Sequence, residues 1–252
     1  METKKNNRIL LIFAACVLAV LLLIAYFSKE EEFVYSDHLT EVAVTVTGDG
    51  SEMVLTLGDL GYYVMTSEEN VNTLAEIYNE SNTGQFWNIY TNHTFIRTKA
   101  KEIALDTAVR DAVYVMEAQK AGMTLTEEEE AAAVARTREI VDGLSFKQYS
   151  VTQYTEETLL PVMERIFLAS KYANDVVEHW DVYGEGYTQA AKVAVEIEGE
   201  YYEDLAQGYT VKTTAVWDRV VLGNLTVQEM VDNSTVFTLE NIKQRFALDG
   251  NS

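Results

Sequence analysis

The chain has 252 residues, of which 48% are hydrophobic, and its formal charge is −21 at neutral pH. This apolar fraction is sufficient for a hydrophobic core and excludes a wholly disordered chain. A surface this acidic repels nucleic acid, so we expect no nucleic acid as a partner. The charge either serves solubility alone or also favours basic or partly unfolded clients.

An uncharged apolar run occupies residues 9–27 and follows the basic residues Lys4, Lys5 and Arg8. As a helix it would span roughly 28 Å, close to the thickness of the hydrocarbon core of a bilayer. The positive-inside rule places the N-terminus in the cytoplasm and the rest of the chain outside. We therefore predict a single-pass signal anchor in the cell membrane. Its representative bilayer contacts are Ile9, Leu10, Leu11, Leu21, Leu22, Leu23, Tyr26 and Phe27.

Two alternatives also export the chain. A cleaved signal peptide has a shorter apolar core and a small-residue cleavage site, which is not seen after this run. A lipoprotein signal would use Cys16, which follows Phe13, Ala14 and Ala15. Cys16 is the only cysteine in the chain. The part beyond the anchor therefore has no disulfide, thiol nucleophile or cysteine metal ligand.

The segment after a charged spacer at 29–40 predicts a β-hairpin that leads into a helix. Val42, Val44 and Val46 alternate along one predicted strand, a Gly-Asp-Gly turn follows, and MVLTL forms the second strand. Thr56 is placed to cap a helix over 57–79, with Asp59 three residues further on. The expected apolar face of this helix is Leu60, Val64, Ser67, Val71, Leu74 and Tyr78.

Three further helices are predicted between Arg97 and Trp180, and each has its own start and stop signals. The first ends before Gly122, a residue suited to a left-handed C-cap. The second begins after Thr126, whose side chain forms a capping box with Glu129. The third begins after Thr155. Their expected apolar faces are Leu105, Val109, Ala112 and Met116 in the first, and Leu159, Met163, Ile166, Ala173, Val177 and Trp180 in the third.

A polar stretch with interleaved aromatic residues, at 81–97, separates the first predicted helix from these three. Its aromatic side chains either pack onto neighbouring helices or form a patch that binds a client peptide. Large aromatic side chains suit both roles. The candidate client contacts lie at the ends of elements, away from the predicted core faces. They are Phe86, Trp87, Tyr90, Phe146, Tyr149 and Tyr154.

The C-terminal part of the sequence predicts strands rather than long helices. AKVAVEI alternates, and YTVKTTAVWDRVVLG is rich in β-branched and aromatic residues, so we expect two to four strands within 190–228. A short helix capped at Thr238 is expected over 236–248. We also hypothesise that these strands pair with the hairpin at 41–57.

Sequence signatures of catalysis are missing. The chain has no G-x-S-x-G, G-x-x-x-x-G-K, G-x-G-x-x-G or H-E-x-x-H motif. Its three histidines, His38, His93 and His179, share no metal-ligand spacing, so we expect no catalytic residue, metal or cofactor. His179 lies at a predicted helix C-terminus, where the helix dipole favours its protonated form.

The chain resembles the N-terminal chaperone region of the SurA and PrsA foldases across residues 41–180. Three stretches carry the resemblance: VTGDGSEMVLTLGDLGYYVM, EAQKAGMTLTEEEE and FKQYSVTQYTEETLLPVMERIFLASKY. It implies a chaperone or foldase that binds unfolded or newly exported polypeptides without ATP, outside the cytoplasm. Many relatives add a parvulin-type prolyl isomerase domain. Residues 184–252 have no histidine or cysteine and are short for that domain, so we do not expect an enzyme.

The expected fold is mainly α with a small β component. A transmembrane helix precedes a helical chaperone-like domain that short antiparallel strands complete. The predicted divisions are 1–28 for the cytoplasmic stub and anchor, 29–40 for the spacer, 41–183 for the helical domain and 184–252 for the β-rich segment. Two alternative functions remain: a non-catalytic scaffold or adaptor for one envelope partner, and a degenerate peptidyl-prolyl isomerase.

Overall fold

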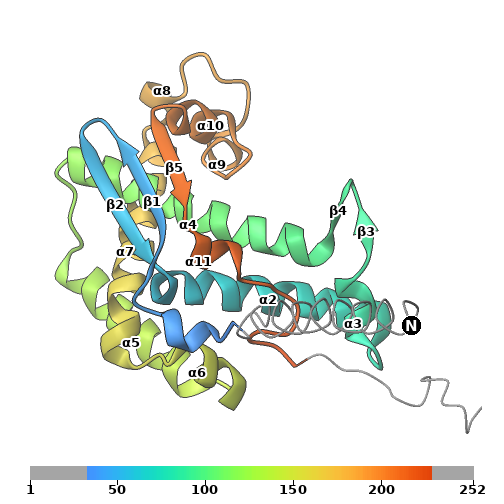
Figure 1. Ribbon diagram of the computed structural model, residues 1–252. Coiled ribbons are helices and arrows are strands. Elements are labelled where there is room, and N and C mark those ends of the chain that lie inside the picture. Colours follow the sequence, from blue (N-terminus) through green and yellow to red (C-terminus); the bar gives the residue numbers. More distant parts are fainter. Residues whose placement is uncertain (1–32, 229–252) are drawn as a thin grey trace, which may run out of the picture. The chain divides into compact units, whose positions relative to one another are not determined.

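The computed structural model describes residues 33–228 and is mainly helical, with two small antiparallel sheets (Figure 1). The predicted anchor at 9–27 and the predicted terminal helix at 236–248 lie outside the described residues. Within residues 33–228, no helix combines the length and the apolarity needed to cross a membrane. The described elements are η1 (Tyr35–His38), β1 (Val42–Gly48), β2 (Ser51–Thr56), α2 (Leu57–Asn79), α3 (Thr83–Trp87), β3 (Tyr90–Thr91), β4 (Thr94–Phe95), α4 (Ile96–Lys120), α5 (Glu127–Gly143), α6 (Phe146–Thr152), α7 (Glu156–Glu178), α8 (Trp180–Tyr183), α9 (Ala191–Ala194), α10 (Glu200–Ala206), β5 (Tyr209–Thr213) and α11 (Ala215–Asp218).

The larger sheet joins the two ends of the described chain. Its strand order is β2-β1-β5, and both pairings are antiparallel. Val46 of β1 lies opposite Val211 of β5, so the C-terminal part returns to the N-terminal hairpin. The hypothesis that C-terminal strands pair with the hairpin is therefore confirmed for β5, the one strand described within residues 190–228. The folded unit also begins earlier than predicted, because Tyr35 is buried and its hydroxyl donates a hydrogen bond to the Leu57 carbonyl at 2.7 Å.

The alternation predicted for β1 is correct at Val44 and Val46, which are both buried, and wrong at Val42, which is exposed. The pairing between β1 and β2 shifts register between Val42 and Val44. Such a shift changes the side of the sheet to which the preceding residues point. Ala43 is consequently buried in place of Val42.

Helix α2 has the bounds that the sequence predicts, Leu57–Asn79. Thr56 and Asp59 form the predicted capping box, in which the Asp59 amide donates to the Thr56 hydroxyl at 3.1 Å. Asp59 also makes an ion pair with Arg165 of α7. One carboxylate therefore both caps α2 and ties it to a helix about a hundred residues further along the chain.

Helix α4 is the centre of the helical layer and lies alongside α2 (Figure 1). All residues from Asp111 to Met116 are buried, so this part of α4 is covered on every side. The sequence predicted only one buried face for this helix and so underestimated how much of it is buried. Gly122 follows the helix with a positive φ of 71°, as its predicted role as a left-handed cap requires.

Helices α5 and α7 pack on each other beside α4. Both predicted N-caps, Thr126 and Thr155, are present with capping boxes. Lys171 of α7 makes an ion pair with Glu129 of α5 at 2.6 Å, and Glu129 is itself a member of its capping box. The buried residues of α7 agree with the prediction at Leu159 and Met163. Further along the helix the buried residues are Ala169, Tyr172 and Val176 instead, because both α4 and α5 cover it.

The strand prediction for residues 190–228 was wrong except at β5. The alternating AKVAVEI begins as the short helix α9, in which Ala194 is buried and Val193 is exposed. The Tyr114 hydroxyl donates to the Val195 carbonyl at 2.6 Å, a contact that fixes this turn against α4. Tertiary contacts override β-propensity here.

A cluster of tyrosines holds the short C-terminal helices on the longer ones. The Tyr114 ring lies 5.4 Å from that of Tyr172 and 5.7 Å from that of Tyr202, and the hydroxyls of Tyr172 and Tyr201 are 2.8 Å apart. Burial raises the pKa of Tyr172 and Tyr202 to about 12, so both remain protonated near neutral pH. The cluster is thus neutral and joins α10 to α4 and α7.

Candidate functional site

Two of the six aromatic residues predicted to contact clients are buried, and the prediction is wrong for them. Trp87 has no exposed surface, and its ring packs against Gly223. Tyr154 is also buried, and its hydroxyl donates to the Gly58 carbonyl at 2.7 Å. Neither side chain can reach a client in the folded protein.

The other four aromatic residues lie in two separate places. Phe86 and Tyr90 belong to α3 and β3, whereas Phe146 and Tyr149 are exposed on α6. Helix α6 packs on α2, and the side-chain amide of Gln148 donates a hydrogen bond to the Glu69 carboxylate. Because residues 69 and 71 point to opposite sides of a helix, α6 lies away from the side of α2 that faces α3 and α4. The predicted contacts therefore do not form one patch.

An apolar groove lies where α2, α3, the β3–β4 hairpin and α4 meet. Its volume is about 610 Å³, within the range of ligand-binding pockets. Phe86 is the one predicted client contact that lines it. The other lining residues are Val71, Leu74, Thr91, Asn92, Thr94, Ile96, Lys99, Ala100, Glu102 and Ile103.

The groove exists because two helices extend beyond the elements that cover them. The predicted apolar face of α2 is buried at Leu60, Val64 and Ser67, but Leu74 is 54% exposed and Tyr78 is 59% exposed. On α4, Ile103 near the N-terminal end is 44% exposed, although the later part of that helix is buried. The prediction that Leu74 and Tyr78 are core residues was therefore wrong, since the described elements that pack on this half of α2, including α3, leave these two side chains exposed.

The wall of the groove formed by α3 is supported from behind by the end of the described chain. Trp87, adjacent to Phe86, packs against Gly223. The segment 223–226 is in turn held by the buried carboxylate of Glu68. That carboxylate accepts hydrogen bonds from the amides of Gly223 at 2.5 Å, Leu225 at 3.1 Å and Thr226 at 2.5 Å, and from the Thr226 hydroxyl at 2.6 Å.

Sequence reasoning missed Glu68 altogether. In the sequence it is one of many acidic residues, and it lies beside the predicted apolar face of α2. The only local indication is that Glu68 follows Ser67, which belongs to that face. This does not separate Glu68 from the next residue, Glu69, which is exposed. The acceptor role depends on a segment 155 residues away or more.

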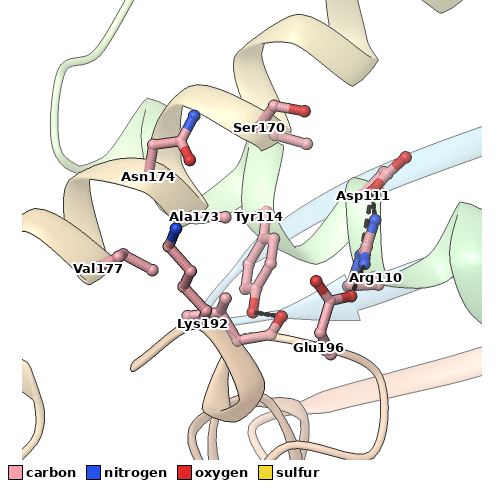
Figure 2. A pocket seen from close by; sticks show the side chains of 11 residues that line it. Arg110, Asp111, Tyr114, Ser170, Ala173, Asn174, Val177, Lys192 and Glu196 are labelled. Atoms are coloured by element: carbon pink, nitrogen blue, oxygen red, sulfur yellow. Dashed lines mark hydrogen bonds and ion pairs between the residues drawn. The ribbon is translucent and has the colours of Figure 1, made fainter. Parts of the chain in front are cut away.

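A second, polar cavity of about 380 Å³ lies between α4, α7 and α9. Figure 2 shows Ser170, Asn174 and Val177 on α7, opposite Lys192 and Glu196. Arg110 makes ion pairs with Asp111 at 3.1 Å and with Glu196 at 2.8 Å.

The charged groups of this polar cavity are mostly neutralised within it. Burial raises the pKa of Asp111, although the charge of Arg110 and a 3.0 Å hydrogen bond from the Tyr63 hydroxyl oppose the shift. Among the described residues, Ser170 has no histidine or carboxylate partner that could act as its general base. The arrangement therefore fits a structural ion-pair network better than a nucleophilic site.

The histidines do not come together. His38 contacts Glu41 at 2.6 Å, His93 occupies the β3–β4 turn with a positive φ of 66°, and His179 caps α7. A hydrogen bond with the Asp175 carbonyl and the charge of Asp175 raise the pKa of His179, as its position predicted. Within residues 33–228, no three histidine, cysteine, aspartate or glutamate side chains form a metal-binding group.

The apolar groove is therefore the best candidate for a functional site, because it is large and several of its apolar side chains, such as Leu74 and Ile103, are exposed. Comparisons with protein-family models, with curated proteins and with solved structures return no match to the chain.

Proposed function

We propose that this protein is a membrane-anchored, extracytoplasmic chaperone that binds unfolded or newly exported polypeptides without ATP. The observation that carries the proposal is the apolar groove, with the exposed side chains of Leu74, Tyr78 and Ile103 around it. Burying a large apolar side chain of a client there contributes about 1.5–3 kcal/mol.

The charge of the protein supports the same proposal. Its formal charge of −21 attracts basic segments over a distance and repels acidic ones. Newly exported chains expose apolar and basic stretches before they fold. A groove on an acidic protein would therefore hold such chains, and the anchor predicted at 9–27 would keep it beside the membrane they cross.

Suppression of aggregation by the full chain in lipid nanodiscs, without nucleotide, tests this function. We expect a denatured client to remain soluble at stoichiometric excess of the protein. Leu74→Asp and Ile103→Asp place a charge in the groove and should abolish the effect. Val193→Asp is the matched control, because Val193 is equally exposed on α9 and lies outside the groove.

Three results would contradict the proposal. Unchanged aggregation with the wild-type protein would remove the chaperone function. Equal protection by all three variants would place the function elsewhere on the molecule. Recovery of a single stoichiometric partner, with no protection of denatured clients, would instead identify an adaptor. A turnover assay with proline peptides should show no isomerase activity.

A further inference from the structure

The two long walls of the groove are both helical. Val71, Leu74 and Tyr78 recur at steps of three and four along α2, and Ile96, Ala100 and Ile103 do so along α4. The Tyr78 ring contacts that of Phe86 at 5.5 Å and extends the wall onto α3. Ridges with this spacing are the surface onto which another helix packs.

These walls offer little to the backbone of an extended peptide. The backbone groups of α2 and α4 are bonded within their own helices, and β3 and β4 are two-residue strands paired with each other. An extended segment pressed against the groove would bury amide and carbonyl groups without partners. Each such group costs about 1–3 kcal/mol. A helix satisfies its own backbone and avoids this cost.

The charged side chains at the α4 edge of the groove carry a net negative charge. Lys99 and Glu102 line the groove, and Asp106, which is not part of the lining, follows one helical turn after Glu102. Burial raises the pKa of Asp106, the Lys99 charge opposes the shift, and the Glu102 charge adds to it, so the three groups lie within electrostatic range of one another. Lys99 is already 3.5 Å from Glu102 and offsets only one of the two carboxylates.

We infer that the groove binds a basic amphipathic helix of another polypeptide, laid along α2 and α4, in preference to an extended segment. The apolar face of that helix contacts Leu74, Phe86 and Ile103, and its lysines or arginines lie beside Glu102 and Asp106. This inference rests on the proposed function, because it specifies which segments of a client the same groove selects.

Two peptides of identical composition test it against the full chain in nanodiscs. Both have about 18 residues, five turns of helix, made only of leucine and lysine. In one the leucines recur with the helical period, and in the other they alternate with lysine as in a strand. We expect the helical-period peptide to bind at least about tenfold more tightly, because one unpaired amide already accounts for such a factor.

The variants assign the binding to this groove. Leu74→Asp and Ile103→Asp should weaken binding of the helical-period peptide about tenfold, and Val193→Asp should leave its affinity unchanged. Glu102→Lys affects an exposed residue and keeps the apolar surface, so it serves as the variant that folds normally. Glu102→Lys should weaken binding of the leucine–lysine peptide. It should strengthen binding of a peptide with the same helical period in which glutamate replaces lysine.

The outcomes separate the inference from the proposed function. Equal or tighter binding of the strand-period peptide overturns the inference. So does the absence of binding by both peptides while denatured clients remain protected in a Leu74-dependent way, and in that case the chaperone function stands. If neither peptide binds and no client is protected, both the inference and the proposed function fail.

Discussion

Glu68 accepts two hydrogen bonds from Thr226 although 158 residues separate them, and both residues are buried. With the amides of Gly223 and Leu225, the carboxylate satisfies four donors of one short segment. This contact fastens the end of the described chain to the middle of α2. It also fixes the segment against Trp87 and thereby supports the wall of the groove.

Removing this carboxylate should be strongly destabilising. Glu68→Ala leaves the buried amides of Gly223 and Thr226 and the half-buried amide of Leu225 without an acceptor, and we expect a loss of about 3–5 kcal/mol in the free energy of unfolding. Glu68→Gln keeps one acceptor oxygen and should lose less. Urea denaturation measures both losses, and hydrogen exchange of the amides of Gly223, Leu225 and Thr226 locates them.

Glu76→Ala is the control for this prediction, because Glu76 is exposed on the same helix. It should change the free energy of unfolding by no more than about 0.5 kcal/mol. Equal effects of the substitutions at Glu68 and Glu76 would show that the buried carboxylate is not a major tether.

Gly223 should not tolerate a side chain. Its φ of 128° is disfavoured for other residues, and an added Cβ would lie 3.4 Å from the Trp87 ring. We expect Gly223→Ala to lower the free energy of unfolding by about 1–3 kcal/mol. Gly143→Ala is the control, because a Cβ there meets no atom within 4 Å. It should be neutral or stabilising by about 0.5–1 kcal/mol.

Asp59 should make stability depend on pH in the acid range. Burial raises its pKa, but the Arg165 charge and the hydrogen bonds with Thr56 outweigh this, and the pKa lies below its ordinary value. A carboxyl group with a lower pKa in the folded state stabilises the protein above its unfolded pKa of about 3.9. That contribution is lost as the pH falls through the folded pKa.

We therefore expect Asp59→Asn to be less stable than the wild type by about 2 kcal/mol near neutral pH. The difference should shrink below about pH 4, where Asp59 of the unfolded wild type becomes protonated, and vanish as the pH falls through the lower pKa of the folded state. Urea denaturation of both proteins across this range measures it. Glu203→Gln, at an exposed residue, should show no such convergence, and a constant difference at Asp59 would contradict the assignment.

The paired hydroxyls of Tyr172 and Tyr201 should contribute about as much as one buried hydrogen bond. Tyr201→Phe removes one hydroxyl and leaves the other buried, so we expect a loss of about 1–2 kcal/mol in the free energy of unfolding. Tyr183→Phe keeps the ring contact with Tyr201 and is the control. Thermal unfolding measures both, and equal shifts would show that the paired Tyr201 hydroxyl contributes no more to stability than the Tyr183 hydroxyl.

Local signals predicted the helices well. Thr56, Thr126 and Thr155 cap α2, α5 and α7 as expected, because a capping box depends on residues three apart. The candidate site was predicted only in part: Phe86 lines the groove, whereas Trp87, its neighbour, is buried. Adjacent aromatic residues look alike in a sequence, and only the segment at Gly223 decides which of them is covered.

The sequence by itself determined where the long helices begin and end, the N-terminal hairpin and the acidic character of the protein, because each depends on composition or on residues a few positions apart. Only the tertiary structure decided that AKVAVEI folds as a helical turn, that β5 joins β1, and that Glu68 holds the end of the described chain. The same holds for the groove, since the exposure of Leu74 depends on which distant elements stop short of it. Burial is a property of the packed chain, and periodicity predicts only which side chains are available for it.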